Sequence, residues 1–314
     1  MPNYSGSWNL VQQMQAVAAS NWPNPTPGTF AIFALGRVSG TSPYGTTTRD
    51  KYTYSGCTVS SGASSSLASF QSGAAAGTSS VGIFAIGLSG CCVLTTRDKV
   101  NYAYNTNSSA TSSTAGTYYG SAAGNSTVGI FALGCNSTTR NKYTYSGCVN
   151  ATATSATNAS WQGAAAGTST VGIFALGVVS GSASTTRNKY TYSGDVNAST
   201  TGSCVGGKYQ SATGNSTVGI FALGNTGSAS TTRCKYTYSG DTNASATAAT
   251  NASYAGSAAG NACVGIFALG FTTTYSTIRN KYTYSGCTNA SATAATVASY
   301  AGAAASNGTT GVNV

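Results

Sequence analysis

The sequence predicts an all-β fold in which six repeated units wrap around one axis, a six-bladed β-propeller. An apolar segment close to VGIFALG recurs with its Phe at Phe33, Phe84, Phe131, Phe174, Phe221 and Phe267. Segments close to TTRNKYTYSG and to ASYAGSAAGN also occur six times each. Successive apolar segments are 51, 47, 43, 47 and 46 residues apart, and four-stranded propeller blades repeat every 40–50 residues or so, roughly this period.

Each unit is predicted to contribute four short strands. The small-residue segment, 254–260 in one unit, suits the innermost strand, because large side chains do not fit where blades crowd the axis. GIFALG is apolar on both alternating faces, as expected of a strand covered on both sides. RNKYTYSG is the third strand and ends in a Ser-Gly turn signal. A small polar segment such as 243–250 suits the outer edge.

An Arg-x-Lys pair recurs in all six third strands. The candidate ligand-binding pairs are Arg49 and Lys51, Arg140 and Lys142, and Arg187 and Lys189. One interpretation is a basic ring that binds acidic sugars or phosphates through bidentate Arg contacts. The other is structural: each Arg hydrogen-bonds carbonyls of the next blade while each Lys reaches water. The structural interpretation is favoured, because a feature repeated in every unit usually holds the units together. Packing is likewise favoured for the Tyr pairs that follow.

The two ends of the repeat region predict closure of the ring. The first apolar strand, 30–36, has no small-residue strand before it, and a spare one stands at 300–305. Docking the spare strand onto the first blade would complete six blades and cover both free edges. The expected domains are therefore an N-terminal segment, 1–27, and a propeller, 28–314. An open β-solenoid is the competing fold.

The order of motifs resembles a kelch blade over about residues 28–314: small strand, apolar strand ending in Gly, Tyr-bearing strand, outer strand. The Gly-Gly doublet and the Trp typical of kelch blades are missing from these units. The resemblance implies a kelch-like propeller.

Composition argues against an enzyme. The chain has no His, and its acidic residues are Asp50, Asp98, Asp195 and Asp241. Acid–base catalysis and Ser–His–Asp chemistry usually need His, Glu or paired Asp. A zinc site without His would need four thiolates, and the cysteines lack CxxC spacing. We expect no catalytic residue, no metal and no cofactor.

The net charge of +10 favours anionic partners, but it is spread over 314 residues. A nucleic-acid binder would cluster its basic residues, so no nucleic-acid partner is expected. No apolar run reaches the length of a membrane span, roughly 18 residues, so no membrane-spanning segment is expected.

Loops that differ between units are the better candidates for recognition, because loops on a rigid scaffold carry binding. The segments after the apolar strand differ most and are expected to share one face. Tyr44, Phe271 and Tyr275 are the exposed aromatic candidates there.

Nine cysteines leave at least one unpaired within the chain. Cys263 and Cys287 lie at the same end of one predicted hairpin and form the preferred disulfide pair. Cys92 and Cys135 follow equivalent strands and form a second candidate pair. The alternative is free thiols or bonds between subunits.

Residues 1–27 lie outside the repeat. Trp8, Leu10, Val11, Met14 and Val17 have near-helical spacing before a Pro-rich stretch. This pattern predicts either an anchoring segment that docks on another protein or a helix folded back on the propeller.

The stretch MPNYSGSWNLVQQMQAVAASNWP resembles the opening of structural proteins encoded by tailed bacteriophages, aquatic ones especially. The resemblance implies a virion component, such as a tail-fibre, tail-tip or head-decorating protein. Other virion proteins would be partners through the N-terminal segment, and a host-surface polysaccharide is the candidate ligand. The expected location is the virion, assembled in the cytoplasm, which agrees with a start that lacks the pattern of a signal peptide. The alternative is a bacterial cell-surface lectin or adhesin.

Overall fold

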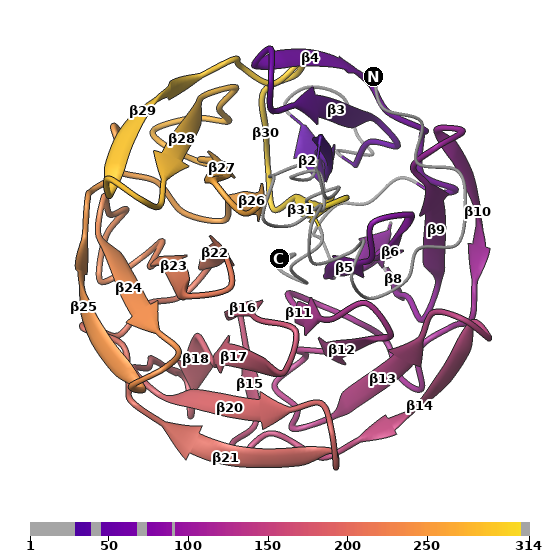
Figure 1. Cartoon of the computed structure of the whole chain (residues 1–314), viewed down its shortest axis with the longest axis horizontal. Helices are drawn as coiled ribbons and strands as arrows, with labels where there is room; N and C mark the ends of the chain where they lie inside the picture. Colours follow the sequence, from indigo (N-terminus) through magenta and orange to yellow (C-terminus); the bar gives the residue numbers. More distant parts are fainter. Residues whose placement is uncertain (1–28, 39–44, 68–73, 90–91, 309–314) are drawn as a thin grey trace, which may run out of the picture.

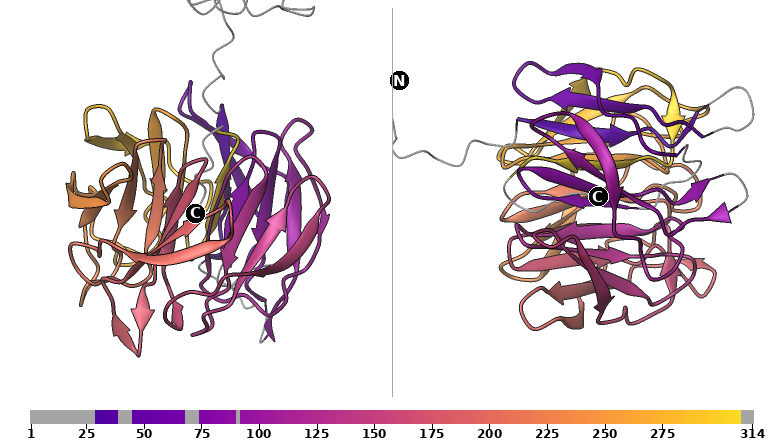
Figure 2. Two further views of the ribbon diagram at one scale, coloured as in Figure 1. Left: turned by 60° about the horizontal axis from the view of Figure 1, so that its bottom comes forward. Right: turned by 90° about the vertical axis from the view of Figure 1, so that its right-hand side faces the viewer.

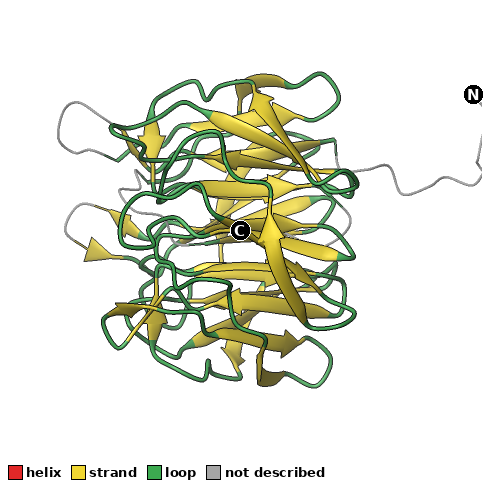
Figure 3. Cartoon of the chain, turned by 90° about the vertical axis from the view of Figure 1, so that its left-hand side faces the viewer, coloured by secondary structure: helices red, strands yellow, loops and turns green. Residues whose placement is uncertain are grey.

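In the computed structural model, described for residues 29–38, 45–67, 74–89 and 92–308, every regular element is a β-strand and no helix occurs within these ranges (Figure 3). The predicted all-β class is confirmed.

The described residues form six four-stranded antiparallel sheets, numbered here in chain order, with strands given from the centre outward. Sheet 1 is β31 (Ala303–Ser306), β1 (Phe30–Ala34), β3 (Arg49–Thr53) and β4 (Thr58–Ser61). Sheet 2 is β5 (Ala75–Gly77), β6 (Val81–Ala85), β9 (Arg97–Asn101) and β10 (Thr106–Ala110). Sheet 3 is β11 (Ser121–Gly124), β12 (Val128–Ala132), β13 (Arg140–Thr144) and β14 (Val149–Ala153).

Sheets 4 to 6 repeat the same order. Sheet 4 is β16 (Ala164–Gly167), β17 (Val171–Ala175), β20 (Arg187–Thr191) and β21 (Val196–Thr200). Sheet 5 is β22 (Ser211–Gly214), β23 (Val218–Ala222), β24 (Arg233–Thr237) and β25 (Thr242–Ala246). Sheet 6 is β26 (Ser257–Gly260), β27 (Val264–Ala268), β28 (Arg279–Thr283) and β29 (Thr288–Ala292).

Short strands add small ribbons near one end of these sheets. They are β2 (Arg37–Val38) with β30 (Ser299–Tyr300), β7 (Leu88–Ser89) with β8 (Cys92–Val93), and β15 (Ser160–Trp161) with β18 (Val178–Val179) and β19 (Ser182–Ala183).

The small-residue strands lie at the centre of the molecule and the polar fourth strands lie at its periphery (Figure 1). Seen from the side, the sheets form a thick disc (Figure 2). Inner strands such as Ala164–Gly167 are fully buried, because only small side chains fit where six strands approach one another. The outer strands consist of exposed and half-buried positions.

β31 supplies the inner strand of sheet 1, although it comes from the other end of the chain. It pairs antiparallel with β1, with Ala34 opposite Ala303 and Ala31 opposite Ser306. The described chain thus starts and ends in the same sheet. Its second and third strands are paired in the same way as in the other sheets.

Apolar side chains fill the spaces between neighbouring sheets. Between sheets 2 and 3, Ala76 and Ile83 pack against Phe131 and Tyr143, all buried. Alternate residues of the VGIFA strand face the two neighbouring sheets, so the strand is buried on both sides, as its sequence predicts.

Each repeated Arg crosses from its own sheet into the next one. Arg140 of sheet 3 donates to the side-chain oxygens of Asn188 at 3.1 Å and Asn197 at 2.7 Å, both in sheet 4. Its guanidinium also lies 4.5 Å from the ring centre of Phe174. Burial lowers the pKa of Arg140 to about 10, so the group remains a cation at neutral pH. We call this arrangement the arginine junction.

The junction recurs between every pair of successive sheets. The Arg and the Phe beneath it are Arg49 with Phe84, Arg97 with Phe131, Arg187 with Phe221, Arg233 with Phe267 and Arg279 with Phe33, at 4.4–4.7 Å. Charge attraction to the ring face and hydrogen bonds to side-chain oxygens together compensate the burial of each cation.

Sheet 1 is flanked by the two junctions that contain a carboxylate. Arg279 of sheet 6 pairs with Asp50 of sheet 1 at 2.8 Å, and Arg49 of sheet 1 pairs with Asp98 of sheet 2 at 2.8 Å. Asn occupies the equivalent position as Asn141, Asn188 and Asn280. The two ion pairs therefore flank the sheet that is assembled from both ends of the described chain.

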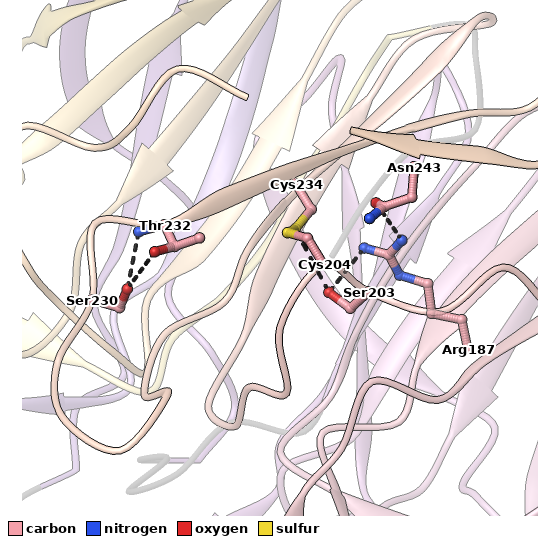
Figure 4. The surroundings of a disulfide bond; sticks show 7 residues. All are labelled: Arg187, Ser203, Cys204, Ser230, Thr232, Cys234 and Asn243. Atoms are coloured by element: carbon pink, nitrogen blue, oxygen red, sulfur yellow. Dashed lines mark hydrogen bonds between the residues drawn. A yellow bond between two sulfur atoms is a disulfide. The ribbon is translucent and has the colours of Figure 1, made fainter. Parts of the chain in front are cut away.

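The acceptor residue also fixes the loop that leads into its own sheet. In sheet 4, the Asn188 amide donates to the Thr157 hydroxyl at 2.8 Å and its oxygen accepts from the Thr157 N–H at 3.0 Å. In sheet 5 these two positions are occupied by Cys234 and Cys204, which form a disulfide with Cα atoms 6.3 Å apart (Figure 4). A covalent bond thus replaces the hydrogen-bonded clamp.

Arg187 adapts to the disulfide. Because Cys234 offers it no oxygen, its guanidinium donates to the Ser203 hydroxyl at 3.4 Å and to Asn243 at 2.9 Å (Figure 4).

The predicted Cys263–Cys287 disulfide is wrong, since both thiols are free. Val264 pairs with Thr283, which places Cys263 beside Tyr284. By Cys287 the chain has already turned toward β29. The predicted Cys92–Cys135 pair is also wrong, because the Cys135 thiol is free and contacts the Gly116 carbonyl at 3.5 Å.

Arg140→Ala is expected to lower the free energy of unfolding by about 3 kcal/mol or more, because it leaves a cavity over Phe174 and unpaired Asn oxygens. Denaturant unfolding measures the loss. The matched variant Lys142→Ala, two residues along the same strand and half-buried, should lie within about 0.5 kcal/mol of the parent. Equal losses for both variants would contradict the junction.

Cys204→Ser is expected to cost about 3 kcal/mol under oxidising conditions, because the disulfide closes a loop of 30 residues. The double variant Cys204→Thr/Cys234→Asn should recover most of this loss by restoring the clamp seen in sheet 4. Denaturation midpoints of the variants, with Cys135→Ser as control, decide the outcome. The account fails if reduction of the parent leaves its stability unchanged.

Candidate functional site

A hollow of about 440 Å³, including the part open to solvent, lies where the inner strands begin, at the centre of one face of the disc. Residues from all six sheets line it, among them Ala74 of sheet 2, Tyr119 of sheet 3 and Tyr209 of sheet 5. We call this space the axial hollow and the surrounding end of the disc the aromatic face.

The rim of the axial hollow is built by backbone that leads into the inner strands. Tyr119, Gln162, Tyr209, Ala255 and Ala301 all have positive φ, between 48° and 58°. Successive sheets are joined there, since the Gln162 N–H donates to the Tyr119 carbonyl at 3.1 Å and the Ala255 N–H to that of Tyr209 at 3.0 Å. These bonds hold the rim residues in fixed positions.

One glycine per unit allows the second strand to approach this rim. At Gly134, with φ of +71°, an added Cβ would lie 2.0 Å from the Tyr118 carbonyl oxygen. At Gly177 the equivalent distance to the Trp161 carbonyl oxygen is 2.4 Å. The Gly that ends each VGIFALG segment is therefore required by backbone crowding around the hollow.

Eight aromatic side chains on this face form a continuous series of ring contacts beside the hollow, which we call the aromatic band. In order of contact they are Tyr118, Tyr119, Trp161, Tyr209, Tyr254, Phe271, Tyr275 and Tyr300, with Trp161 joined to Tyr209 through Tyr119. Tyr119 and Tyr209 lie 5.2 Å apart at their ring centres and line the hollow itself. The band runs from sheet 3 to sheet 1.

Two cations belong to the same face. Arg37 on β2 pairs with Tyr300 on β30, donates to its hydroxyl at 3.0 Å and lies 5.7 Å from its ring centre. Its charge also reaches Tyr119: burial raises the pKa of the Tyr119 phenol, and Arg37 acts in the opposite direction. Lys208 directly precedes Tyr209 and is half-buried.

Gln210 adds a polar group to the lining of the hollow. Its amide nitrogen donates to the Gly207 carbonyl at 2.7 Å, whereas its buried side-chain oxygen has no hydrogen-bond partner among the described residues. A buried acceptor of this kind is costly unless it meets a donor.

The predicted recognition residues fall into two groups. Phe271 and Tyr275 belong to the aromatic band, on the loop where the sequence places them. Tyr44 lies outside the described residues, as do the anchoring candidates Trp8, Leu10, Val11, Met14 and Val17.

The repeated Arg-x-Lys pairs lie away from the hollow. Arg49, Arg140 and Arg187 are 1% exposed and make the arginine junctions, so they present no guanidinium to a ligand. Lys51 lies 4.2 Å from the ring centre of Phe30, and Lys189 pairs with Asp241 at 3.0 Å. Lys142 is half-buried on β13. This placement corresponds to the structural interpretation of the repeat, except that the acceptors in the next sheet are Asn and Asp side-chain oxygens instead of the expected carbonyls.

Sequence reasoning missed most of the aromatic band. Tyr118, Trp161, Tyr254 and Tyr300 each stand two residues before the Gly that leads into an inner strand. Aligning the units on this Gly would have shown an aromatic at that position in four of them. In sheet 5, where Gln210 replaces this Gly, alignment on the inner strand places Lys208 at the same position.

The lining of the hollow offers ring faces, tyrosine hydroxyls and backbone groups. Among the described residues no three His, Cys, Asp or Glu side chains lie close enough together to hold a metal ion. None of the described elements is a helix long and apolar enough to cross a membrane.

Comparison with known proteins identifies the fold class. No protein-family model matches the chain, and no curated protein matches it by sequence. Among solved structures, TolB from Acinetobacter baumannii, a β-propeller, superposes with a TM-score of 0.58 at 12% identity, over 95% of this chain and 72% of TolB. The chain therefore has a β-propeller fold, and at this identity the likeness says nothing more.

Proposed function

We propose that this chain is a non-enzymatic binding protein, a six-bladed β-propeller that presents the axial hollow to a saccharide. The aromatic band beside the hollow is the observation that carries the proposal. Aromatic rings offer flat apolar faces with a negative quadrupole, which suit the C–H faces of sugars, and tyrosine hydroxyls suit their hydroxyl groups. Concave sites with apolar walls and a few polar groups are the usual form of small-ligand sites.

Closure into a single six-bladed ring is part of this proposal. The Arg279–Asp50 pair joins sheet 6 to sheet 1 at 2.8 Å, across 229 residues of sequence. The pairing of β31 with β1 then completes the first blade from the far end of the chain. Kelch-like character stays a prediction from the order of the motifs.

Tyr119→Ala and Tyr209→Ala are expected to weaken saccharide binding at least about tenfold, since each removes a ring that lines the hollow. Both substitutions should fold, because Ala255 and Ala301 occupy the equivalent positive-φ positions in sheets 6 and 1. Calorimetric titration with fragmented bacterial surface polysaccharides measures the affinity. The matched control is Tyr104→Ala, a tyrosine 78% exposed at the other end of the disc. Loss of binding in the control alone would place the site elsewhere.

We further propose that the protein is displayed on a tailed-phage particle, as tail fibre, tail tip or capsid decoration, and contributes to host attachment. The N-terminal resemblance supports this role, although residues 1–27 lie outside the described structure. The described chain begins beside Phe30 and ends beside Ser306, at the end of sheet 1 away from the aromatic face. A preceding anchor would thus join the disc opposite the hollow. A bacterial surface lectin is the second candidate, favoured by the same aromatic band.

Protein analysis of purified phage particles and of host envelopes separates these two roles. We expect the chain in particles, at a fixed ratio to the major capsid protein. Its presence in envelopes of uninfected cells and absence from particles would overturn the phage role and leave the lectin role standing.

A further inference from the structure

We propose that the axial hollow selects an acidic saccharide, one whose sugar ring carries a carboxylate. This inference rests on the proposed function, because it names the class of ligand that the same site would take. It follows from how the charges of the molecule are distributed between the aromatic face and the rest of the disc.

All four acidic side chains of the chain lie away from the aromatic face. Asp50 and Asp98 are fully buried in arginine junctions between sheets. Asp195 and Asp241 lie in the turns that join the third and fourth strands of sheets 4 and 5, at the opposite end of the disc. A ligand in the hollow therefore meets no carboxylate side chain.

The charges that do lie beside the hollow are positive, and they flank it from two different sheets. Arg37 is held against Tyr300 by a hydrogen bond and by ring contact, next to the lining residues Ala301 and Gly302. Lys208 directly precedes the lining residues Tyr209 and Gln210. Since no carboxylate side chain lies on the aromatic face, both charges favour an anion there.

Lys208 is also unusual within its own repeat, because the other five units carry an aromatic residue or, in the second unit, Gln71 at this position. The equivalent residue is Tyr118 in sheet 3, Trp161 in sheet 4, Tyr254 in sheet 6 and Tyr300 in sheet 1. The backbone of Lys208 forms the same pair of hydrogen bonds as that of Tyr254: its N–H donates to the Asn225 carbonyl at 3.0 Å, and its carbonyl accepts from the Asn225 N–H at 2.9 Å. Its ammonium makes no hydrogen bond or ion pair within the described residues. The substitution thus replaces an aromatic of the band with a cation that no internal partner uses.

Arg37 is likewise a departure from its repeat. The residue after the positive-φ Gly is Leu88, Cys135, Val178, Asn225 or Phe271 in the other five units. None of these is charged. Two independent departures from the repeat therefore place a cation on the aromatic face, and a planar guanidinium is well suited to bind a carboxylate through paired hydrogen bonds.

The resulting site has a division of roles. The rings of Tyr119 and Tyr209 would pack against the sugar ring, while Arg37 and Lys208 would pair with its carboxylate.

The test compares a uronic-acid hexasaccharide with its carboxyl-reduced, neutral counterpart by calorimetric titration of the full chain. We expect the acidic form to bind at least about tenfold more tightly at low salt, and the difference to shrink as ionic strength rises. Arg37→Gln and Lys208→Gln should each reduce the preference, lowering affinity for the acidic form by a larger factor than affinity for the neutral form. Lys142→Gln, which removes one charge from β13, is the matched control.

The outcomes separate the two proposals. Equal affinity for both hexasaccharides, lost in Tyr209→Ala, would overturn the acidic preference and keep the saccharide site. A preference for the acidic form that Lys142→Gln reduces as much as Arg37→Gln would also overturn it, since general charge would then suffice. No binding of either form or of any surface polysaccharide would overturn the proposed function itself.

Discussion

The arginine junction is the contact on which the packing of the sheets depends. Each inner strand offers only small side chains, and each second strand is apolar on both faces, so no sheet could bury its own surface alone. The junction sets how neighbouring sheets meet: a guanidinium on the ring of the next Phe, with its hydrogens directed to Asn or Asp oxygens. Because these bonds are directional, they specify relative position in a way that apolar packing does not. A different residue at the acceptor position changes only the contacts around it: where Cys234 replaces Asn, a disulfide to Cys204 forms and Arg187 bonds to Ser203 instead.

The hollow is a consequence of the same packing. Six small-residue strands converge on the axis, and the backbone that leads into them forms a rim of positive-φ residues joined by hydrogen bonds. The rim is fixed by backbone, so its side chains are free to differ between units. Tyr119 and Tyr209 occupy two of the rim positions, further aromatic residues lie beside the rim, and Lys208 and Arg37 place cations on the same face. The repeated residues therefore build the scaffold, and the residues that differ between units determine the charge and the side chains of the aromatic face.

Much of the fold follows from periodicity, because a unit that cannot bury VGIFALG alone must be covered by its neighbours. The strand order and the burial of the repeated Arg follow from the same pattern. Contacts between units were harder to predict. Cys204 and Cys234 occupy in sheet 5 the positions that Thr157 and Asn188 occupy in sheet 4, where the two side chains are in contact. This equivalence is seen in the structure and not in the sequence spacing. The aromatic band combines residues from five sheets, and linear sequence places just Phe271 and Tyr275 among them.

The central claim is that successive sheets are joined by arginine junctions all the way round, so that the last meets the first. A double-mutant cycle of Arg279→Ala and Asp50→Ala, followed by denaturant unfolding, measures this contact directly, because the two residues meet only if the ring closes. Each single variant leaves a buried charge without its partner, so the double variant should lose less than the sum, with a coupling of about 2 kcal/mol. A coupling indistinguishable from zero would contradict closure at this seam.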